Sequence, residues 1–307
     1  MAASEVPEFD LAALFGNMAP PETAEDMRRL IDGFGGFINA DLPSVGAFHE
    51  NVAVSDGVTA DVVVPQGTGP FPVLVYLHGG GWICGSPATH RKVGHRFAEA
   101  GYLVFNVDYR LAPEHPFPTP FEDCIGAIRW AAREAARYGG DASRIAVGGD
   151  SAGGNLAAAS AAALHAEPAC PKAALLIYGV FDFARLASAE EVAGAQESGA
   201  MQVLGEKMVR LMVESYLGAG PTRAILEDPR VSPLHAADRL PPTHVVCGEA
   251  DPLVVQARDL VARLAKAGIE HECFIDPAMP HGYVQMEMLP PARPALDRMV
   301  AFLRKHV

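Results

Sequence analysis

The sequence Gly149-Asp150-Ser151-Ala152-Gly153-Gly154 lies between a short apolar run and a stretch rich in Ala and Leu. The apolar run, residues 144–148, is typical of a buried strand, and residues 155–165 are strong helix formers. Ser151 is therefore predicted to lie on a tight turn from a strand into a helix. Such a turn forces rarely used backbone angles on the serine and leaves no room for side chains two residues before and after it, where the sequence has glycine.

The pattern Gly149-x-Ser151-x-Gly153 is that of a nucleophile elbow, which holds a serine hydroxyl out at the edge of a sheet. The N-terminus of the following helix directs backbone N–H groups at whatever binds that oxygen. A serine at a helix start is more often a cap, so this pattern alone does not establish a nucleophile. Other motifs in the chain are needed to distinguish a nucleophilic serine from a helix cap.

Length, charge and cysteine content narrow the class of protein. The 307 residues, half of them apolar, suffice for one large core, and the net charge of −13 disfavours nucleic acid as a partner because a polyanion would be repelled. No apolar run reaches the roughly 18 residues of a membrane span, so no membrane partner is expected. The N-terminus lacks the basic and apolar regions of a signal peptide, and the five cysteines form no Cys-x-x-Cys pair. We therefore expect a cytoplasmic protein with free, buried thiols.

From about residue 46 onward, predicted strands and helices alternate along the chain. This alternation predicts an α/β fold, the α/β-hydrolase type of architecture, with a mostly parallel central sheet and helices on both faces. The predicted strands are residues 58–64, 72–77, 102–107, 144–148, 173–178, 243–247 and 271–275, and the predicted helices are residues 91–100, 120–138, 155–165, 253–267 and 294–306.

The first segment outside this alternation is residues 1–45, predicted to form an N-terminal cap segment. Met27, Leu30 and Ile31 share one face of a helix that follows Pro20-Pro21, and the glycines at 33, 35 and 36 are expected to end that helix.

The second such segment, residues 181–235, is predicted to be a cap insertion between the two parts of the catalytic domain, 46–180 and 236–307. Methionines, a leucine and a tyrosine at 208, 211, 212 and 216 mark one face of a helix in it. A methionine-rich helix here is consistent with a lid over the strand ends, and equally with an extra helix packed on the core.

Because a serine hydroxyl is a weak nucleophile, Ser151 needs a base and a third group that orients the base. After an elbow of this kind the acid and the histidine come later, in that order, on loops that follow successive strands. Asp251 and His281 occupy these places, although Asp251 before Pro252 is also consistent with a turn aspartate, and His281 with an exposed loop histidine. The other candidates are Asp228 and Asp276 for the acid and His271 and His306 for the base; Asp228 lies in the insertion, and the two histidines lie within a strand and the last helix.

A tetrahedral oxyanion also needs hydrogen-bond donors, each worth roughly 3 to 4 kcal/mol of the barrier. His78-Gly79-Gly80-Gly81-Trp82 follows the strand that ends at Leu77, and its three glycines let consecutive N–H groups face one point, while Ala152 adds an N–H from the elbow. A phosphate-binding loop is disfavoured because no Lys-Ser/Thr follows and the G-x-G-x-x-G spacing is absent. No metal is predicted, since there is no His-Glu-x-x-His and no acidic cluster.

Taken together, these motifs resemble the hormone-sensitive-lipase-like branch of the α/β-hydrolase esterases, the bacterial family IV type. The resemblance runs from about residue 50 to the C-terminus and departs from the family pattern at Tyr283, where phenylalanine is usual. The matching motifs are His78-Gly79-Gly80-Gly81-Trp82, Tyr109-Arg110-Leu111-Ala112-Pro113-Glu114, Gly149-Asp150-Ser151-Ala152-Gly153-Gly154, Ser232-Pro233-Leu234, Asp251-Pro252-Leu253 and His281-Gly282-Tyr283.

The resemblance implies a serine carboxylesterase that acts through an acyl-enzyme on small-molecule esters with short acyl chains and needs no cofactor. Family members often dimerise through the last strand and neighbouring helices, so a homodimer is the assembly to test. The implied site consists of a triad and three backbone donors: Ser151, Asp251 and His281 as catalytic residues, and the N–H groups of Gly80, Gly81 and Ala152 as the oxyanion hole.

Two other functions on this scaffold stay open at this point. An amidase such as an arylformamidase has a similar glycine loop and differs only in the bond that it cleaves. A non-catalytic ligand receptor of the same fold is the alternative from another class, and the presence of His281 argues against it because such receptors have lost that histidine.

Four charged residues near these motifs are ambiguous. Arg110 and Glu114, with Asp123 on the next helix, are consistent with a cluster that braces the oxyanion loop, and equally with a plain surface ion pair. Asp150 is consistent with a hydrogen bond to the loop that carries His281, or with a cap on the elbow helix.

Overall fold

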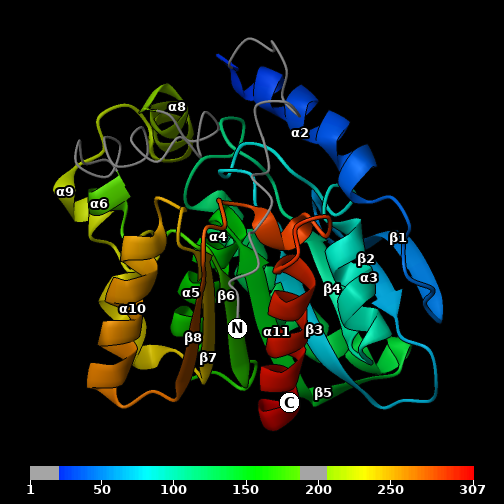
Figure 1. Ribbon diagram of the computed structural model, residues 1–307. Coiled ribbons are helices and arrows are strands. Elements are labelled where there is room, and N and C mark those ends of the chain that lie inside the picture. The colour runs from blue at the N-terminus through cyan, green and yellow to red at the C-terminus, as the bar shows by residue number, and fades with distance from the viewer. Residues whose placement is uncertain (1–20, 187–205) are drawn as a thin grey trace, which may run out of the picture.

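The computed structural model describes residues 21–186 and 206–307, which form an eight-stranded sheet with helices on both of its faces (Figure 1). β3 to β8 pair in parallel, whereas β2 pairs antiparallel with both β1 and β4. The prediction of an α/β fold with a mostly parallel sheet is confirmed. In spatial order the strands are β1 (Ala47–Ser55), β2 (Val58–Val64), β4 (Leu103–Asp108), β3 (Phe71–Leu77), β5 (Gly140–Asp150), β6 (Ala173–Ile177), β7 (Thr243–Gly248) and β8 (His271–Asp276).

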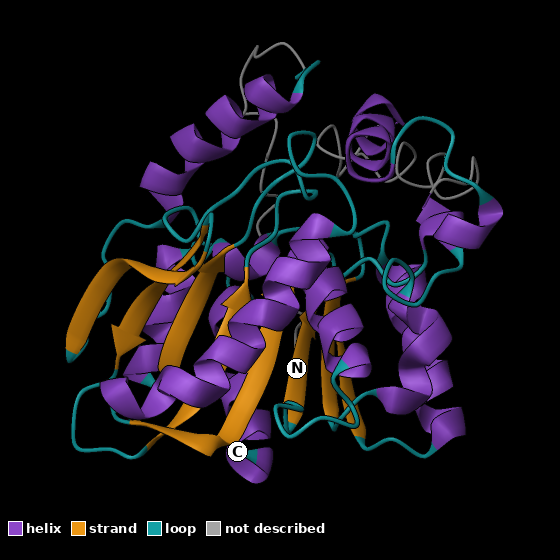
Figure 2. Ribbon diagram, turned by 180° about the vertical axis from the view of Figure 1, so that it is seen from behind, coloured by secondary structure: helices purple, strands orange, loops and turns teal. Residues whose placement is uncertain are grey.

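The helices form a layer on each face of the sheet. α3 (Arg91–Glu99) and α11 (Ala292–His306) lie in front of the sheet in Figure 1. Figure 2 shows the opposite face, which is covered by α4 (Thr119–Glu134), α5 (Ala152–Ala163) and α10 (Val254–Ala267), with the 3-10 turn η1 (Ala135–Tyr138) continuing α4. Because both faces are covered, β3 and β6 are almost entirely apolar, and every residue of β6 is buried.

Among the strands of residues 21–186 and 206–307, β1 is the one that the sequence analysis does not predict. It lies at the edge of the sheet, where it pairs with β2 alone and is mostly exposed. Its central residues His49, Glu50 and Asn51 are polar, so the apolar run that indicates a buried strand is missing.

The helix α2 (Ala24–Ile38) begins at Thr23, whose side chain and that of Asp26 form a capping box. The prediction that glycines 33, 35 and 36 end this helix is wrong, since it continues to Ile38. At Gly35 the helix lies against Thr89, since a Cβ here would come within 3.3 Å of Thr89 Cγ2 and 3.4 Å of Thr89 Cα. The glycine here therefore serves a close helix contact that the local sequence does not reveal.

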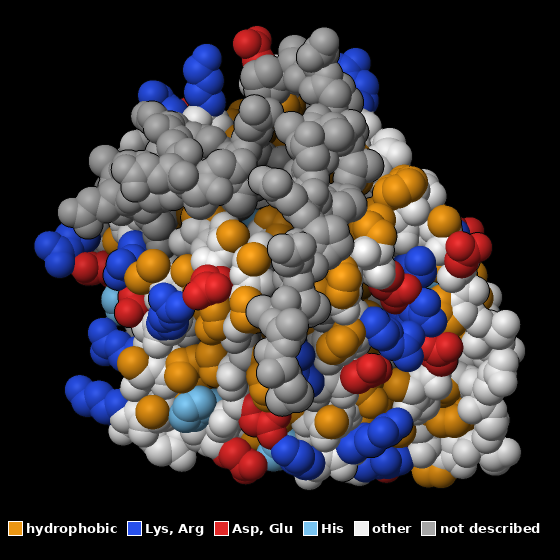
Figure 3. Space-filling view, in the orientation of Figure 1, with side chains coloured by type: hydrophobic (Ala, Val, Ile, Leu, Met, Phe, Trp, Pro, Cys, Tyr) orange, Lys and Arg blue, Asp and Glu red, His pale blue; other side chains and the backbone are white. Residues whose placement is uncertain are grey.

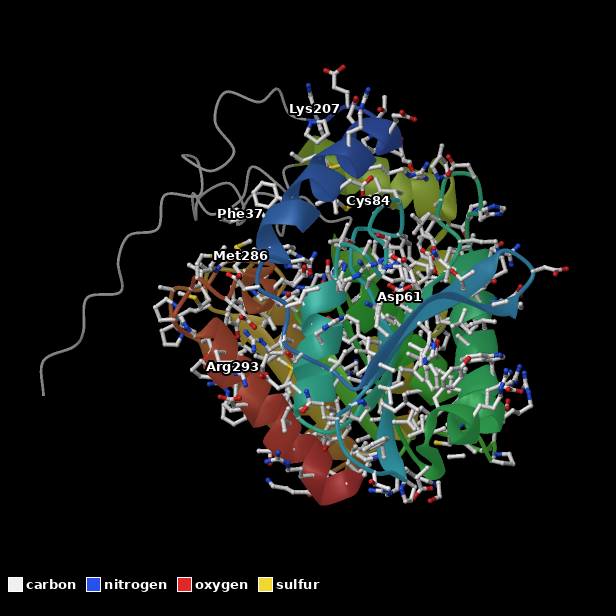
Figure 4. All side chains as sticks on the ribbon, turned by 90° about the vertical axis from the view of Figure 1, so that its right-hand side faces the viewer. Phe37, Asp61, Cys84, Lys207, Met286 and Arg293 are labelled. Atoms are coloured by element: carbon white, nitrogen blue, oxygen red, sulfur yellow. The ribbon has the colours of Figure 1, made fainter. Side chains whose placement is uncertain are left out.

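Arg28 connects α2 to the loops at the carboxyl ends of the strands through hydrogen bonds and an ion pair. Its guanidinium donates to the carbonyl oxygens of Ile83 (2.8 Å) and Ala112 (3.0 Å) and pairs with both carboxylate oxygens of Glu114. Figure 4 shows α2 from the side, with the labelled Cys84 beside it. The expected cluster of Glu114 with Arg110 and Asp123 is thus wrong for Glu114, whose partner lies 86 residues earlier in the chain.

Arg110 and Asp123 do pair as the sequence analysis expects. The Arg110 guanidinium donates to both oxygens of the Asp123 carboxylate, at 2.6 and 2.9 Å, and its backbone N–H donates at 3.1 Å. Asp123 is buried, so this pair joins α4 to the segment after β4.

Segments from the second cap region lie above the carboxyl ends of the strands, beside α2 in both Figures 1 and 2. Asn155 on α5 binds the chain near both ends of this region. Its amide donates to the carbonyl oxygens of Val180 and Val231, each at 2.8 Å. Predictions for residues 1–20 and 187–205 lie outside the described residues. The elements of this region are α6 (Phe183–Leu186), α8 (Glu206–Leu217), α9 (Arg223–Leu226) and η2 (Pro233–Arg239).

The surface of the α3 and α11 layer carries interspersed acidic and basic side chains, as Figure 3 shows. Arg96 pairs with Glu287 at 2.6 Å, and Arg293 pairs with Glu99 at 3.2 Å. All five cysteines are free thiols, three of them buried and two half-buried. In the parts of the chain that the structure describes, no helix is both long and apolar enough to cross a membrane.

Replacing Gly153 by alanine should destabilise the folded protein, because the added Cβ would lie 1.9 Å from the carbonyl oxygen of Leu77. We expect the Gly153→Ala variant to lose about 3 kcal/mol or more of its free energy of unfolding, measured by urea denaturation. Gly126, inside α4, is the matched control because nothing lies within 4 Å of its Cβ position. Gly126→Ala should gain about 0.5 to 1 kcal/mol. Equal stability of Gly153→Ala and the wild type would contradict this close approach.

Candidate active site

The nucleophile elbow is built by the contact between the start of α5 and the end of β3. A Cβ at Gly149 would lie 2.4 Å from the carbonyl oxygen of Gly153, and one at Gly153 would lie closer still to Leu77. This contact holds Ser151 at φ 54° and ψ −119°, which non-glycine residues rarely adopt. The Ser151 side chain makes no capping bond to α5, so its hydroxyl is available for another role.

Three side chains from separate loops form one chain of hydrogen bonds. Ser151 Oγ lies 2.9 Å from His281 Nε2, and His281 Nδ1 lies 2.8 Å from Asp251 Oδ2. The second carboxylate oxygen of Asp251 accepts the N–H of Leu253 at 2.8 Å. One carboxylate oxygen of Asp251 thus stabilises the turn that contains Asp251, and the other binds His281.

The environment of His281 makes its imidazole more basic. Burial lowers the pKa of His281, but the charge of Asp251 and its hydrogen bond outweigh burial and raise the pKa above its usual value. The Tyr178 ring packs against the imidazole, with ring centroids 4.8 Å apart. His281 is therefore held between a carboxylate, an aromatic ring and the serine.

The competing acids and histidines have other partners. Asp228 pairs with Arg230 at 2.7 Å, and Asp276 accepts from Tyr283 and Arg298. His271 lies on β8, where its ring contacts the Ile269 carbonyl oxygen, and His306 lies on α11. None of these four side chains contacts Ser151, and in the described residues no three His, Cys, Asp or Glu side chains group as a metal site.

The glycine loop after β3 and the start of α5 contain backbone N–H groups without a protein partner among the described residues. Gly80 and Gly81 have φ of 125° and 60°, and the Gly80 carbonyl accepts from the N–H groups of Ile83 and Cys84, which tightens the turn. Within residues 21–186 and 206–307, the N–H groups of Gly80, Gly81 and Ala152 donate to no other protein atom. Unpaired N–H groups of this kind can bind an anionic oxygen.

The helix α8 packs on this loop with the face predicted from its sequence. A Cβ at Gly81 would lie 2.4 Å from Met212 Sδ, and the Trp82 ring stacks on Tyr216 with centroids 4.9 Å apart. Phe183 packs against the same indole at 4.7 Å. The described part of this helix thus packs on buried aromatic residues, as the interpretation of an extra helix packed on the core expects.

Asp150 contacts the loop that carries His281, which is the first of the two alternatives. Its Oδ2 accepts the Gln285 amide at 2.7 Å, from the short 3-10 turn η3 (Tyr283–Gln285). The sequence analysis misses Gln285 and also His90, whose Nε2 lies 3.3 Å from Asp150. The position of Gln285, four residues after His281, is the only signal in the sequence that could have indicated it.

Comparison with known proteins places this fold among hydrolases. The family model described as alpha/beta hydrolase fold matches residues 74–285. The chain is 35% identical over 239 residues to carboxylesterase NlhH of Mycobacterium tuberculosis, covering 76% of this chain and 74% of the relative. It is 34% identical over 240 residues to ethyl acetate hydrolase of Pseudomonas putida, with coverage of 76% and 73%.

A solved structure of an esterase from the bacterial hormone-sensitive lipase family superposes with a TM-score of 0.79 at 35% identity, covering 94% of this chain and 93% of that chain. The chain therefore belongs to the α/β-hydrolase family, in its hormone-sensitive-lipase-like esterase branch.

Proposed function

We propose that this protein is a serine carboxylesterase in which Ser151 is the nucleophile, His281 the general base and acid, and Asp251 the group that orients His281. The observation that carries the proposal is the continuous hydrogen-bond chain from Ser151 through His281 to a buried carboxylate. The carboxylesterase and ethyl acetate hydrolase relatives support the reaction class, and none of the reported relatives is named for an amide substrate.

In the first half of the reaction Ser151 Oγ attacks the ester carbonyl carbon and His281 Nε2 takes the serine proton. Asp251 keeps the other imidazole nitrogen protonated and stabilises the imidazolium that forms. His281 then gives its proton to the leaving alcohol, which leaves the acyl group on the serine. In the second half a water attacks the acyl-enzyme, with the same histidine as base, and the acid is released.

The negative charge that develops on the carbonyl oxygen is assigned to the N–H groups of Gly80, Gly81 and Ala152. Their lack of other partners among the described atoms supports this role, because a donor already paired would have to break a bond first. The N-terminus of α5, which begins at Ala152, adds a favourable dipole at the same point.

The proposed substrates are small esters with short acyl chains. Beside the oxyanion donors, Met212, Trp82 and Tyr216 fill the space with buried side chains, which limits how far a long chain can extend in that direction. We assign residues 1–45 and 181–235 to a cap over the catalytic domain, and the positions of α2 and α8 above the strand ends support that division.

We also propose a homodimeric, cytoplasmic enzyme. The edge strand β8 is half-exposed along most of its length, so its backbone offers a pairing surface for a second copy. The five free thiols fit a reducing compartment.

Substitution of the nucleophile should remove turnover without unfolding the chain. We expect Ser151→Ala to lower kcat for p-nitrophenyl acetate by a factor on the order of 10⁶, with an unchanged circular dichroism spectrum. Ser160→Ala is the matched control, since Ser160 is a buried serine of the same helix and its hydroxyl has no partner among the described residues. Its kcat should equal that of the wild type. Turnover retained by Ser151→Ala would contradict the mechanism.

The rate of ester hydrolysis should fall as the acyl chain of the substrate becomes longer. Because buried side chains crowd the donors, kcat/KM should be higher for p-nitrophenyl acetate and butyrate than for the palmitate ester, measured as initial rates below micelle-forming concentrations. A maximum at palmitate would contradict the short-chain assignment while leaving the triad intact.

The pH dependence follows from the pKa of His281. The imidazole has to be neutral to accept the serine proton, and its pKa is raised above 6.5, so it stays protonated to higher pH than a free histidine. A plot of kcat/KM against pH should therefore rise with pH and reach half its plateau above pH 6.5. A midpoint below this value would show that the Asp251 carboxylate does not stabilise the imidazolium.

A further inference from the structure

Asp150 is the residue before the proposed nucleophile. Its carboxylate is buried, and both of its oxygens have hydrogen-bond partners. Its Oδ1 accepts the Tyr76 hydroxyl at 2.8 Å and the Gly79 N–H at 3.0 Å. Its Oδ2 accepts the Gln285 amide at 2.7 Å and lies 3.3 Å from His90 Nε2. Only 2% of the residue is exposed, so water contributes little to its solvation.

These bonds join the three segments that carry Ser151, the oxyanion loop and His281. Asp150 itself is covalently next to Ser151, Gly79 is next to the oxyanion donor Gly80, and Gln285 lies four residues after His281. The three segments lie at the ends of β3, β5 and β8; β3 and β5 pair directly, whereas β6 and β7 separate β8 from them. One carboxylate is thus the point at which these loops are tied together.

The glycine loop is shaped around this carboxylate. A Cβ at Gly79 would lie 2.4 Å from Asp150 Oδ2, so any side chain at position 79 would displace the carboxylate. The glycine after His78 and the aspartate before Ser151 are therefore coupled through space, although 71 residues separate them.

We propose that Asp150 is a positioning residue that sets His281 and the oxyanion loop in register with Ser151, acting through Gln285 and Gly79. The inference rests on the proposed function and deepens it, because it assigns the alignment of the site to one side chain that touches no substrate. A misplacement of about 1 Å at a reacting group can cost about 10²-fold in rate, so a link of this kind affects kcat.

The charge of Asp150 gives the proposal a second, independent readout. Burial raises the pKa of Asp150, but the His90 and Tyr76 contacts outweigh burial and hold the pKa below its usual value, so the group is ionised near neutral pH. This anion also raises the pKa of His281, adding to the larger effect of Asp251. Loss of the Asp150 charge should therefore move the acid limb of the pH profile to lower pH.

The other titratable groups around the two residues have to be accounted for. Burial lowers the pKa of His78 to about 3 and raises the pKa of each nearby tyrosine, so these groups stay neutral across the acid limb. His90 is the remaining group, and a His90→Gln variant removes it. The groups facing Asp150 are Tyr76 on β3, His78 in the glycine loop, His90 before α3, Tyr109 after β4 and Tyr178 after β6, and those facing His281 are Asp150, Asp251 and Tyr178.

The test compares Asp150→Asn and Gln285→Leu, with Asp123→Asn as the matched control. Asp123 is also a buried aspartate with several hydrogen bonds, but it lies on α4 and its partner is Arg110. Steady-state kinetics with p-nitrophenyl acetate are measured from pH 5 to 9, and kcat is expressed per active site titrated with a p-nitrophenyl phosphonate.

We expect Asp150→Asn to lower the plateau kcat by about 10- to 100-fold and to shift the acid limb to lower pH. Gln285→Leu keeps the charge and breaks the link, so it should lower kcat without that shift, and its half-buried side chain makes folding less of a risk. Asp123→Asn should lose stability but keep the wild-type kcat and acid limb. His90→Gln should keep an acid limb, because that limb belongs to His281.

An acid limb that does not move in Asp150→Asn, or that moves equally in Asp123→Asn, would overturn the proposal. Wild-type kcat per active site in Gln285→Leu would overturn it as well. Failure of the proposed function is distinguishable, since it would show as ester hydrolysis absent from the wild type or retained in Ser151→Ala.

Discussion

The close approach of α5 to the end of β3 is the constraint on which the rest of the site depends. With hydrogen in place of a side chain at Gly153, the first turn of the helix reaches the carbonyl oxygen of Leu77. That contact holds Ser151 in its strained conformation and brings the N-terminus of α5 beside the glycine loop. Nucleophile and oxyanion donors thus share one rigid support, so little has to reorganise during the reaction.

Two buried carboxylates act on His281 in different ways. Asp251 contacts the imidazole directly, while Asp150 contacts the loops on either side of it. An ionised group away from water is costly unless hydrogen bonds compensate, and both carboxylates meet that condition with several donors. Their combined charge makes His281 a stronger base than a histidine in water.

The parts of the structure that follow from local sequence could be predicted, and the parts that depend on distant partners could not. The elbow needs only glycines two residues from Ser151, and the buried strands are continuous apolar runs. The local sequence predicts a helix end at Gly35 because the contact with Thr89 that explains this glycine is tertiary. It groups Glu114 with Arg110 and Asp123 because nothing near Glu114 indicates Arg28, which lies on α2. The strand β1 lies at an exposed edge, which removes the apolar signal.

The claim that Ser151 forms a covalent intermediate is tested most directly by mass spectrometry after inactivation with an alkyl p-nitrophenyl phosphonate. The account predicts one phosphonyl group per chain, located on Ser151 by peptide fragmentation, with modification and loss of esterase activity rising together. Complete inactivation with Ser151 unmodified, or with the group on another residue, would contradict it.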